Sequence, residues 1–184
     1  MPTLTDPAVI KELLQRHGFS FSRALGQNFI INPGVCPRMA ELGGAAPGVG
    51  VLEIGPGIGP LTAELAQRAG KVVSVELDKS LLPVLAETMA PYPNVEIVPG
   101  DVMKLDLAGL AAEKFQGLTP IVCANLPYNI TTPVLTKLIE TPCFETVTVL
   151  IQKEVAQRLS AAQGTSDGGS FSLFLQYHME TAYL

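Results

Sequence analysis

The residues whose types could do chemistry form a short motif, Asn125, Leu126, Pro127 and Tyr128, directly after the apolar run 120–124. An exocyclic amine on an aromatic ring has a delocalised lone pair, so an enzyme that methylates it needs acceptors for the amine and a surface for the ring. Asn125 offers a side-chain carbonyl, and Leu126, which precedes a proline, could turn its backbone carbonyl towards a pocket. Pro127 adds rigidity, and Tyr128 offers a plane on which a flipped base could stack. The motif indicates methyl transfer to a planar amine.

The same four residues also fit a purely structural interpretation. In it, the segment is a strand-to-helix turn in which Asn125 caps the helix, Pro127 stiffens the turn and Tyr128 is half-buried. The motif alone leaves both interpretations open. Two further features of the sequence favour the chemical one.

A glycine-rich turn lies about 70 residues before this motif. Residues 51–54 have the pattern of a buried strand, Gly55, Gly57 and Gly59 follow it, and residues 61–68 have helical spacing. Glycine lets a backbone approach a ligand closely, and the start of a helix favours negative charge. The dinucleotide fingerprint, however, needs its third glycine one position later than Gly59. The turn therefore predicts a cofactor without a pyrophosphate.

Two acidic residues follow the next two predicted strands. Glu76 lies 21 residues after Gly55, where a carboxylate accepts both ribose hydroxyls in this architecture. Asp101 follows the third strand, where it could accept a hydrogen bond from the amino group of an adenine ring. Their positions at successive strand ends beside a glycine turn favour a functional role. Asp78 and Asp106 lack such positions and are interpreted as solvated carboxylates.

The elements that must position these residues alternate regularly. Strands are predicted near 50–54, 72–76, 95–98, 120–124 and 146–151, helices between 6 and 18, between 32 and 42, and near 60–69, 79–89, 132–140, 152–161 and 170–178, and the start of a further strand at the end of the chain. This alternation predicts an α/β fold with a mostly parallel sheet and helices on both faces. Such sheets bind ligands at the carboxyl ends of their strands, where Gly55, Glu76, Asp101 and Asn125 all fall.

Motifs along most of the chain resemble those of the ribosomal RNA adenine dimethyltransferase family. They occur in the family's order at residues 25–30, 53–59, 76–78, 100–101, 125–130 and 152–155. The family also includes the erythromycin-resistance methyltransferases, which modify large-subunit RNA. The Asn-Leu-Pro-Tyr form of the motif and the Gly-Gln-Asn-Phe opening are more similar to the small-subunit enzymes. The resemblance implies a Rossmann-like fold that binds S-adenosylmethionine.

The resemblance also implies which residues hold the methionine end of this cofactor. Asn28 and the backbone of Ile30 would contact S-adenosylmethionine, and Gln27 would lie beside its amino-acid end. Gly55 would lie under the methionine part, with Gly57 in the same turn.

The remaining contacts implied by the resemblance run from the ribose to the target base. Glu76 would lie under the ribose, and Asp101 would hold the cofactor's adenine, with the backbone of Val102 nearby. Asn125 would sit between cofactor and target, and Tyr128 would stack on the target adenine.

The implied reaction is dimethylation of the exocyclic amines of two adjacent adenines in small-subunit (16S) ribosomal RNA, coupled to ribosome biogenesis. The partner would be that RNA or an immature small ribosomal subunit, and the protein would act as a monomer. No metal or covalent intermediate is implied, because the sulfonium is already an activated methyl donor. Catalysis would depend on alignment and on hydrogen bonds to the amine.

We expect one methyltransferase domain over 1–184, with an amino-terminal helical segment at 1–45 and an α/β core at 46–184. The chain departs from the family's pattern at 164–171, where small residues replace a tyrosine and a basic residue and predict a mobile loop. It also ends before the family's Phe-x-Pro-x-Pro segment, its final strands and its carboxyl-terminal helical domain. We therefore expect an amino-terminal part of a longer enzyme, with an exposed sheet edge and with cofactor binding better preserved than catalysis.

Composition agrees with one cytoplasmic domain. Of the 184 residues, 47% are apolar, which suffices for one sizeable core, and the sequence has neither an 18-residue apolar stretch nor a signal-peptide pattern. The three cysteines lack metal-ligand spacing and are interpreted as packed thiols. A net charge of −5 is unusual for an RNA enzyme, but residues 1–40 carry +2 and the remainder −7. The expected missing part could supply more positive charge.

Other functions remain open. DNA-adenine and protein-glutamine methyltransferases use a related Asn-Pro-Pro-Tyr motif, although Leu126 and the opening at 26–29 weigh against them. A ribosome-assembly factor would bind immature small subunits and use methylation only as a release signal, so Asn125→Ala would abolish methylation and spare binding. A nicotinamide oxidoreductase is the weakest alternative, because the third glycine of its fingerprint is absent.

Overall fold

The computed structural model describes residues 3–18, 29–161 and 169–184 of the chain. Within these residues, parallel strands form one five-stranded sheet in the order β3-β2-β1-β4-β5. The strands are β1 (Val49–Ile54), β2 (Lys71–Glu76), β3 (Val95–Pro99), β4 (Thr119–Asn125) and β5 (Val147–Leu150). The predicted parallel sheet is confirmed, and each strand lies within two residues of its predicted position.

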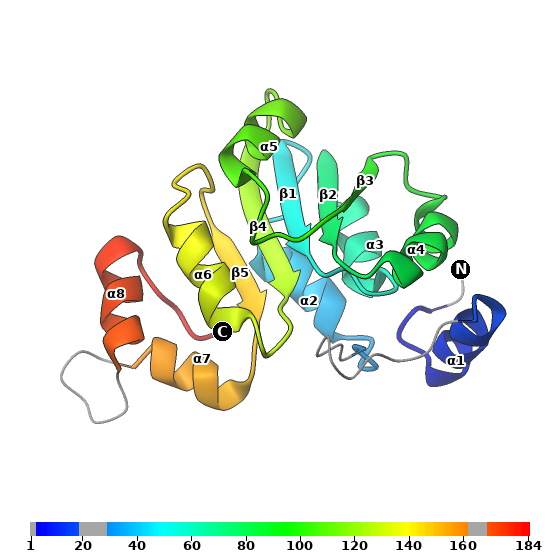
Figure 1. Ribbon diagram of the computed structural model, residues 1–184, viewed down its shortest axis with the longest axis horizontal. Coiled ribbons are helices and arrows are strands. Elements are labelled where there is room, and N and C mark those ends of the chain that lie inside the picture. Colours follow the sequence, from blue (N-terminus) through cyan, green and yellow to red (C-terminus); the bar gives the residue numbers. More distant parts are fainter. Residues whose placement is uncertain (1–2, 19–28, 162–168) are drawn as a thin grey trace.

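Helices connect successive strands and cover both faces of the sheet (Figure 1). They are α1 (Pro7–Arg16), α2 (Val35–Leu42), α3 (Pro60–Ala66), the short 3₁₀ helix η2 (Lys79–Leu81), α4 (Leu82–Met89), α5 (Leu107–Lys114), α6 (Thr131–Ile139), α7 (Lys153–Leu159) and α8 (Ser170–His178). In Figure 1, α1 lies beyond α4 at one end of the molecule, and α7 and α8 lie beyond β5 at the other.

The alternating direction of side chains along the central strands explains why helices pack on both faces of the sheet. Leu52 and Ile54 of β1 belong to a buried cluster that also takes side chains from α5, α6 and α8. Val51 points the opposite way and packs in a second cluster with α2 and α3. Successive side chains of a strand point to opposite faces, so an apolar strand is stable only between two layers of helices.

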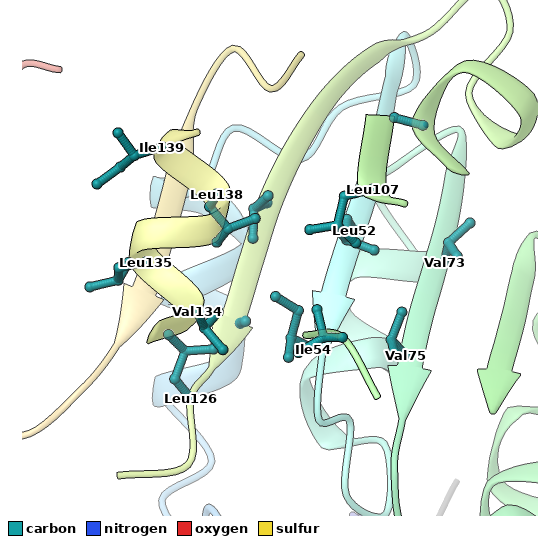
Figure 2. Packing of buried hydrophobic residues seen from close by; sticks show 14 of the residues in the cluster. Leu52, Ile54, Val73, Val75, Leu107, Leu126, Val134, Leu135, Leu138 and Ile139 are labelled. Atoms are coloured by element: carbon teal, nitrogen blue, oxygen red, sulfur yellow. The ribbon is translucent and has the colours of Figure 1, made fainter. Parts of the chain in front are cut away.

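The larger cluster leads directly to the start of α6. Leu126, which is 1% exposed, lies in it together with Val134. Figure 2 shows these two side chains beside each other where the chain leaves β4 and enters α6. Burial of Leu126 therefore fixes the segment that begins at Asn125 against the core.

Two expectations about the elements are wrong. Helix α5 was not predicted, although Asp106 is its N-cap and accepts a hydrogen bond from the Gly109 amide at 3.0 Å. This cap also corrects the interpretation of Asp106 as merely solvated. Residues 179–184 form no strand, because a strand needs a hydrogen-bonded neighbour and no described segment pairs with them.

The cysteines are packed thiols, as predicted. Cys36 and Cys123 are buried in the second cluster, and burial raises the pKa of each thiol to about 12. Cys143 is partly buried, and burial also raises its pKa. None of the helices in the described part of the chain is long and apolar enough to cross a membrane.

Candidate active site

A pocket of about 260 Å³ opens at the carboxyl ends of β1, β2, β3 and β4. Parallel strands end at one edge, so loops far apart in the chain meet there. The pocket is lined by all the sequence-predicted site residues that the structure describes, namely Ile30, Gly55, Gly57, Glu76, Asp101, Val102, Asn125, Leu126, Pro127 and Tyr128. Gln27 and Asn28 lie outside the described residues. The structure brings the predicted residues together, and their individual roles remain predictions.

The floor of the pocket includes the glycine turn between β1 and α3. Gly55, Gly57 and Gly59 have φ values of 67°, 63° and 95°, a left-handed conformation that side chains disfavour. The Gly55 amide donates to the Val75 carbonyl at 3.0 Å, which ties the turn to β2. The ring of Phe29 lies 3.8 Å from where a Cβ of Gly57 would be. Phe29, in the segment before α2, thus lies against the glycine turn.

Glu76 ends β2 beside the glycine turn and is only 5% exposed. Its Oε1 accepts the Asp78 amide at 2.8 Å. Burial raises the pKa of the Glu76 carboxyl, and hydrogen bonds from the amides of Asp78 and Gly57 act in the opposite direction. Backbone amides therefore hold the carboxylate in position at the pocket wall, where it can accept hydrogen bonds from hydroxyl groups.

Asp101 begins the loop that follows β3. Its Oδ1 accepts the Met103 amide at 2.9 Å, and the Lys104 ammonium lies 3.6 Å from Oδ2. The local turn therefore orients this carboxylate. Val102 is buried next to it and lines the same pocket.

Asn125 is the last residue of β4 and does not cap the following helix. The N-cap of α6 is Ile130, whose amide donates to the Pro127 carbonyl at 3.1 Å, and the Thr131 hydroxyl donates to the same carbonyl at 3.2 Å. The turn is thus held by Pro127, which leaves Asn125 at the pocket wall. The structural interpretation, in which Asn125 caps, is wrong on this point.

Tyr128 stands at the mouth of the pocket. This residue is 49% exposed although it lines the cavity. An aromatic ring left half in water costs hydrophobic stabilisation that burial would provide. The exposed ring offers a flat apolar surface to an incoming planar group.

Glu53 also lines the pocket, although no role was predicted for it from the sequence. It is 1% exposed in β1, and its Oε2 accepts the hydroxyls of Thr62 and Ser74, each at 2.7 Å. Burial raises the pKa of the Glu53 carboxyl from 4.5 to about 7; the two hydroxyls lower it and the charge of Glu76 raises it further. An acidic residue inside an apolar strand next to a glycine turn was the signal in the sequence.

The order of the parallel strands and the pocket at their carboxyl ends define the class of this protein. It has the Rossmann-like fold of S-adenosylmethionine-dependent methyltransferases. The crystal structure of the 23S rRNA methyltransferase ErmE is similar to it, with a TM-score of 0.63 and 32% identity over 74% of this chain and 53% of that one. A dimethyladenosine transferase from Plasmodium falciparum is similar with a TM-score of 0.65 and 30% identity over 79% of this chain and 50% of that one.

Within that class the chain belongs to the ribosomal RNA adenine dimethylase family, whose model matches residues 18–184. Two curated relatives are both named Ribosomal RNA small subunit methyltransferase A. The one from Alkaliphilus oremlandii is 44% identical over 97% of this chain and 62% of its own length. The one from Geobacillus kaustophilus is 46% identical over 96% of this chain and 61% of its own length. The chain thus spans about three fifths of the length of these relatives.

Proposed function

We propose that this chain binds S-adenosylmethionine at the carboxyl edge of its sheet and transfers the methyl group to the exocyclic amines of adenines in small-subunit ribosomal RNA. The observation that carries the proposal is the convergence of the glycine turn, Glu76, Asp101 and residues 125–128 on one pocket. These features come from four different strand ends, and each suits a different part of the cofactor or target.

The cofactor would lie along the strand ends. Its methionine part would cross the glycine turn at Gly55 and Gly57, with Ile30 and the predicted contacts Gln27 and Asn28 above it. The buried carboxylate of Glu76 would accept the ribose hydroxyls, since a buried acceptor is best satisfied by such donors.

The adenine end of the cofactor would lie at the loop after β3. Asp101 would accept a hydrogen bond from the amino group of the adenine, and Val102 would lie beside the adenine ring. Leu77 and Met103 line the same pocket and are partly exposed, so an adenine ring placed there would cover apolar surface at its mouth.

The target base would stack on Tyr128, with its amine held by the Asn125 side chain and the Leu126 carbonyl. These acceptors would orient the amine lone pair towards the sulfonium, and Pro127 would keep the turn rigid. The sulfonium is an activated donor, so the reaction needs no metal for its methyl-transfer step. The proton can leave after transfer, and a second round would convert the monomethyl product to the dimethyl product.

The substrate class follows from the relatives. The names of the relatives point to small-subunit ribosomal RNA and the name of the family to adenine, which favours RNA adenines over DNA adenine or protein glutamine. We propose that the targets are two adjacent adenines of 16S RNA, in the free RNA or in an immature small subunit. We propose that the protein acts on this substrate in the cytoplasm, as part of ribosome biogenesis. We further propose a monomer in which 1–45 is a helical segment and 46–184 the α/β core of one domain.

Titration calorimetry tests the cofactor site with S-adenosylmethionine, S-adenosylhomocysteine and NAD. We expect saturable binding of the first two and none of NAD. Glu76→Gln keeps the shape of the side chain and removes the charged acceptor, so binding should weaken by roughly 10-fold to 100-fold. Glu113→Gln, at a side chain that is 69% exposed, is the matched control and should bind as the wild type does. Undiminished binding by Glu76→Gln would contradict the proposed site.

A second arm tests the chemistry with small ribosomal subunits that lack the modification and with radiolabelled S-adenosylmethionine. Asn125→Ala should lower the methylation rate by at least roughly 100-fold and leave S-adenosylhomocysteine binding within a few fold of the wild type. Methylation at the wild-type rate by this variant would contradict the assignment of Asn125. Sedimentation of the subunits with the variant separates chemistry from subunit binding.

A further inference from the structure

A lysine that does not line the pocket connects α6 with the loop after β3, part of which does line it. The ammonium of Lys137, on α6, donates to the carbonyls of Met103 and Leu105 at 2.9 and 2.7 Å. Both carbonyls belong to the loop between β3 and α5, which begins near Asp101. Hydrogen bonds to an ammonium are stronger than those between neutral groups, so this contact fixes the loop at two points.

Lys137 and Asp101 are connected through one residue, Met103. The Met103 amide donates to Asp101 Oδ1 at 2.9 Å, while the Met103 carbonyl accepts from Lys137. The peptide groups on either side of Met103 are thus held by the two side chains. If the Lys137 bond is removed, the Met103 amide loses its fixed position, and the Asp101 carboxylate loses an orienting donor.

The other end of α6 carries the motif at 125–130. The helix begins at Thr131, whose hydroxyl donates to the Pro127 carbonyl. Lys137 lies six residues further on, about 9 Å along the helix axis. One rigid helix therefore contacts the turn that would hold the target base and the loop that would hold the cofactor's adenine.

We propose that Lys137 is a positioning residue that fixes the loop at 101–105 against α6 and thereby sets how selectively Asp101 recognises the adenine of the cofactor. This inference rests on the proposed function, because it assumes that the adenine lies at Asp101. Lys137 is not among the residues that line the pocket, so it would act on Asp101 through Met103.

The test compares S-adenosylhomocysteine with S-inosylhomocysteine, whose ring has an oxo group in place of the amino group. A site built to accept from an amino group rejects the analogue that lacks it. We expect the wild type to prefer S-adenosylhomocysteine by roughly tenfold or more. Lys137→Met should weaken binding of S-adenosylhomocysteine by roughly tenfold and change binding of S-inosylhomocysteine little, so the preference should fall towards one.

Three further variants separate positioning from mere stability. Lys137→Arg and Lys137→Gln keep donors and should restore part of the preference. Lys114→Met is the matched control, because the Lys114 ammonium also contacts two oxygens, Glu96 Oε1 at 2.7 Å and Glu113 Oε1 at 2.9 Å, but lies at the other end of α5. It should keep the wild-type preference whatever its melting temperature.

The outcomes distinguish the inference from the proposed function. A Lys137→Met protein with the wild-type preference would overturn the role of Lys137 and leave the cofactor site standing. A wild type that binds S-adenosylhomocysteine without preferring it would overturn adenine recognition at Asp101, and with it this inference. A wild type that does not bind S-adenosylhomocysteine would overturn both the proposed function and the inference.

Discussion

Glu53 shows how one buried residue can make the stability of the protein depend on pH. Its Oε2 takes both hydroxyl hydrogen bonds, from Thr62 and Ser74, so it links β1 to α3 and β2 beneath the glycine turn. Burial raises the pKa of this carboxyl to about 7. The folded protein therefore holds a proton on Glu53 at pH values where the unfolded chain has already lost it.

The sign of the stability effect follows from this difference. Between pH 4.5, the ordinary pKa of the group, and pH 7, only the folded state binds the proton, so the unfolding free energy falls as the pH rises. The total loss is on the order of 3 kcal/mol, and the contribution is level above about pH 7. Glu53→Gln mimics the neutral acid, because its carbonyl can accept both hydroxyls. We expect the variant to lose this decline.

Urea unfolding of the wild type and of Glu53→Gln at several pH values from 4.5 to 8 measures the effect. The difference between the two proteins cancels the titration of other groups, such as Glu87 and Glu96, whose pKa values are lowered chiefly by hydrogen bonds with His17 and Lys114 respectively. Parallel curves for the two proteins would refute the assignment of the proton to Glu53.

At the scale of elements, β1 and α5 fit together through a glycine. A Cβ added to Gly50 would lie 2.3 Å from the ring of Phe115, which is buried at the end of α5. The glycine therefore makes room for the ring between the helix and the sheet. Packing therefore explains the glycine at position 50, since its φ is not in the left-handed region that favours glycine.

We expect Gly50→Ala to destabilise the protein by roughly 1 to 3 kcal/mol, because the core around Phe115 is closely packed and the new methyl group overfills it. Chemical denaturation measures the change. Gly48→Ala is the matched control, since a Cβ there meets nothing within 4 Å. Pairing Gly50→Ala with Phe115→Leu should recover part of the loss, and equal stability of the two glycine variants would rule out this packing account.

At the scale of the whole molecule, α1 is held by its apolar side rather than by its charges. Ile10, Leu13 and Leu14 are buried in a third cluster with α4 and Ile58 of the glycine turn. Arg16 and His17 also lie 2.6 Å from Glu87 on α4, but the Arg16 and Glu87 side chains are 55% and 44% exposed. Exposed ion pairs contribute little to stability, so the cluster carries the attachment.

Leu13→Ala should therefore lower the unfolding free energy by roughly 2 to 5 kcal/mol, the range for a buried leucine whose removal leaves a cavity. Glu87→Gln, which removes the ion pair with Arg16 and the carboxylate that contacts His17, should change it far less. Thermal and urea unfolding of the two variants make the comparison. A larger loss in Glu87→Gln than in Leu13→Ala would show that charges, not apolar contacts, hold α1.

Local patterns were enough to predict most of the framework. The five strands follow from short apolar runs, and the capped helix α1 from the Asp6-Pro7 start. By contrast, α5 was missed because its small, weakly amphipathic stretch gives little periodicity, and its helix is fixed by the Asp106 cap and by Phe115 packing. The expectation that a strand starts at the end of the chain was wrong for a related reason, since strands depend on a partner elsewhere in the chain.

The sequence by itself determined which residues end each strand, and because parallel strands end at one edge, it also determined that Gly55, Glu76, Asp101 and Asn125 would meet. Only the tertiary structure decided what surrounds them. The two hydroxyls on Glu53 and the reach of Lys137 to the loop after β3 join residues from different elements. Such contacts depend on how helices pack on the sheet, and no spacing along the chain encodes the direction of a side chain across that interface.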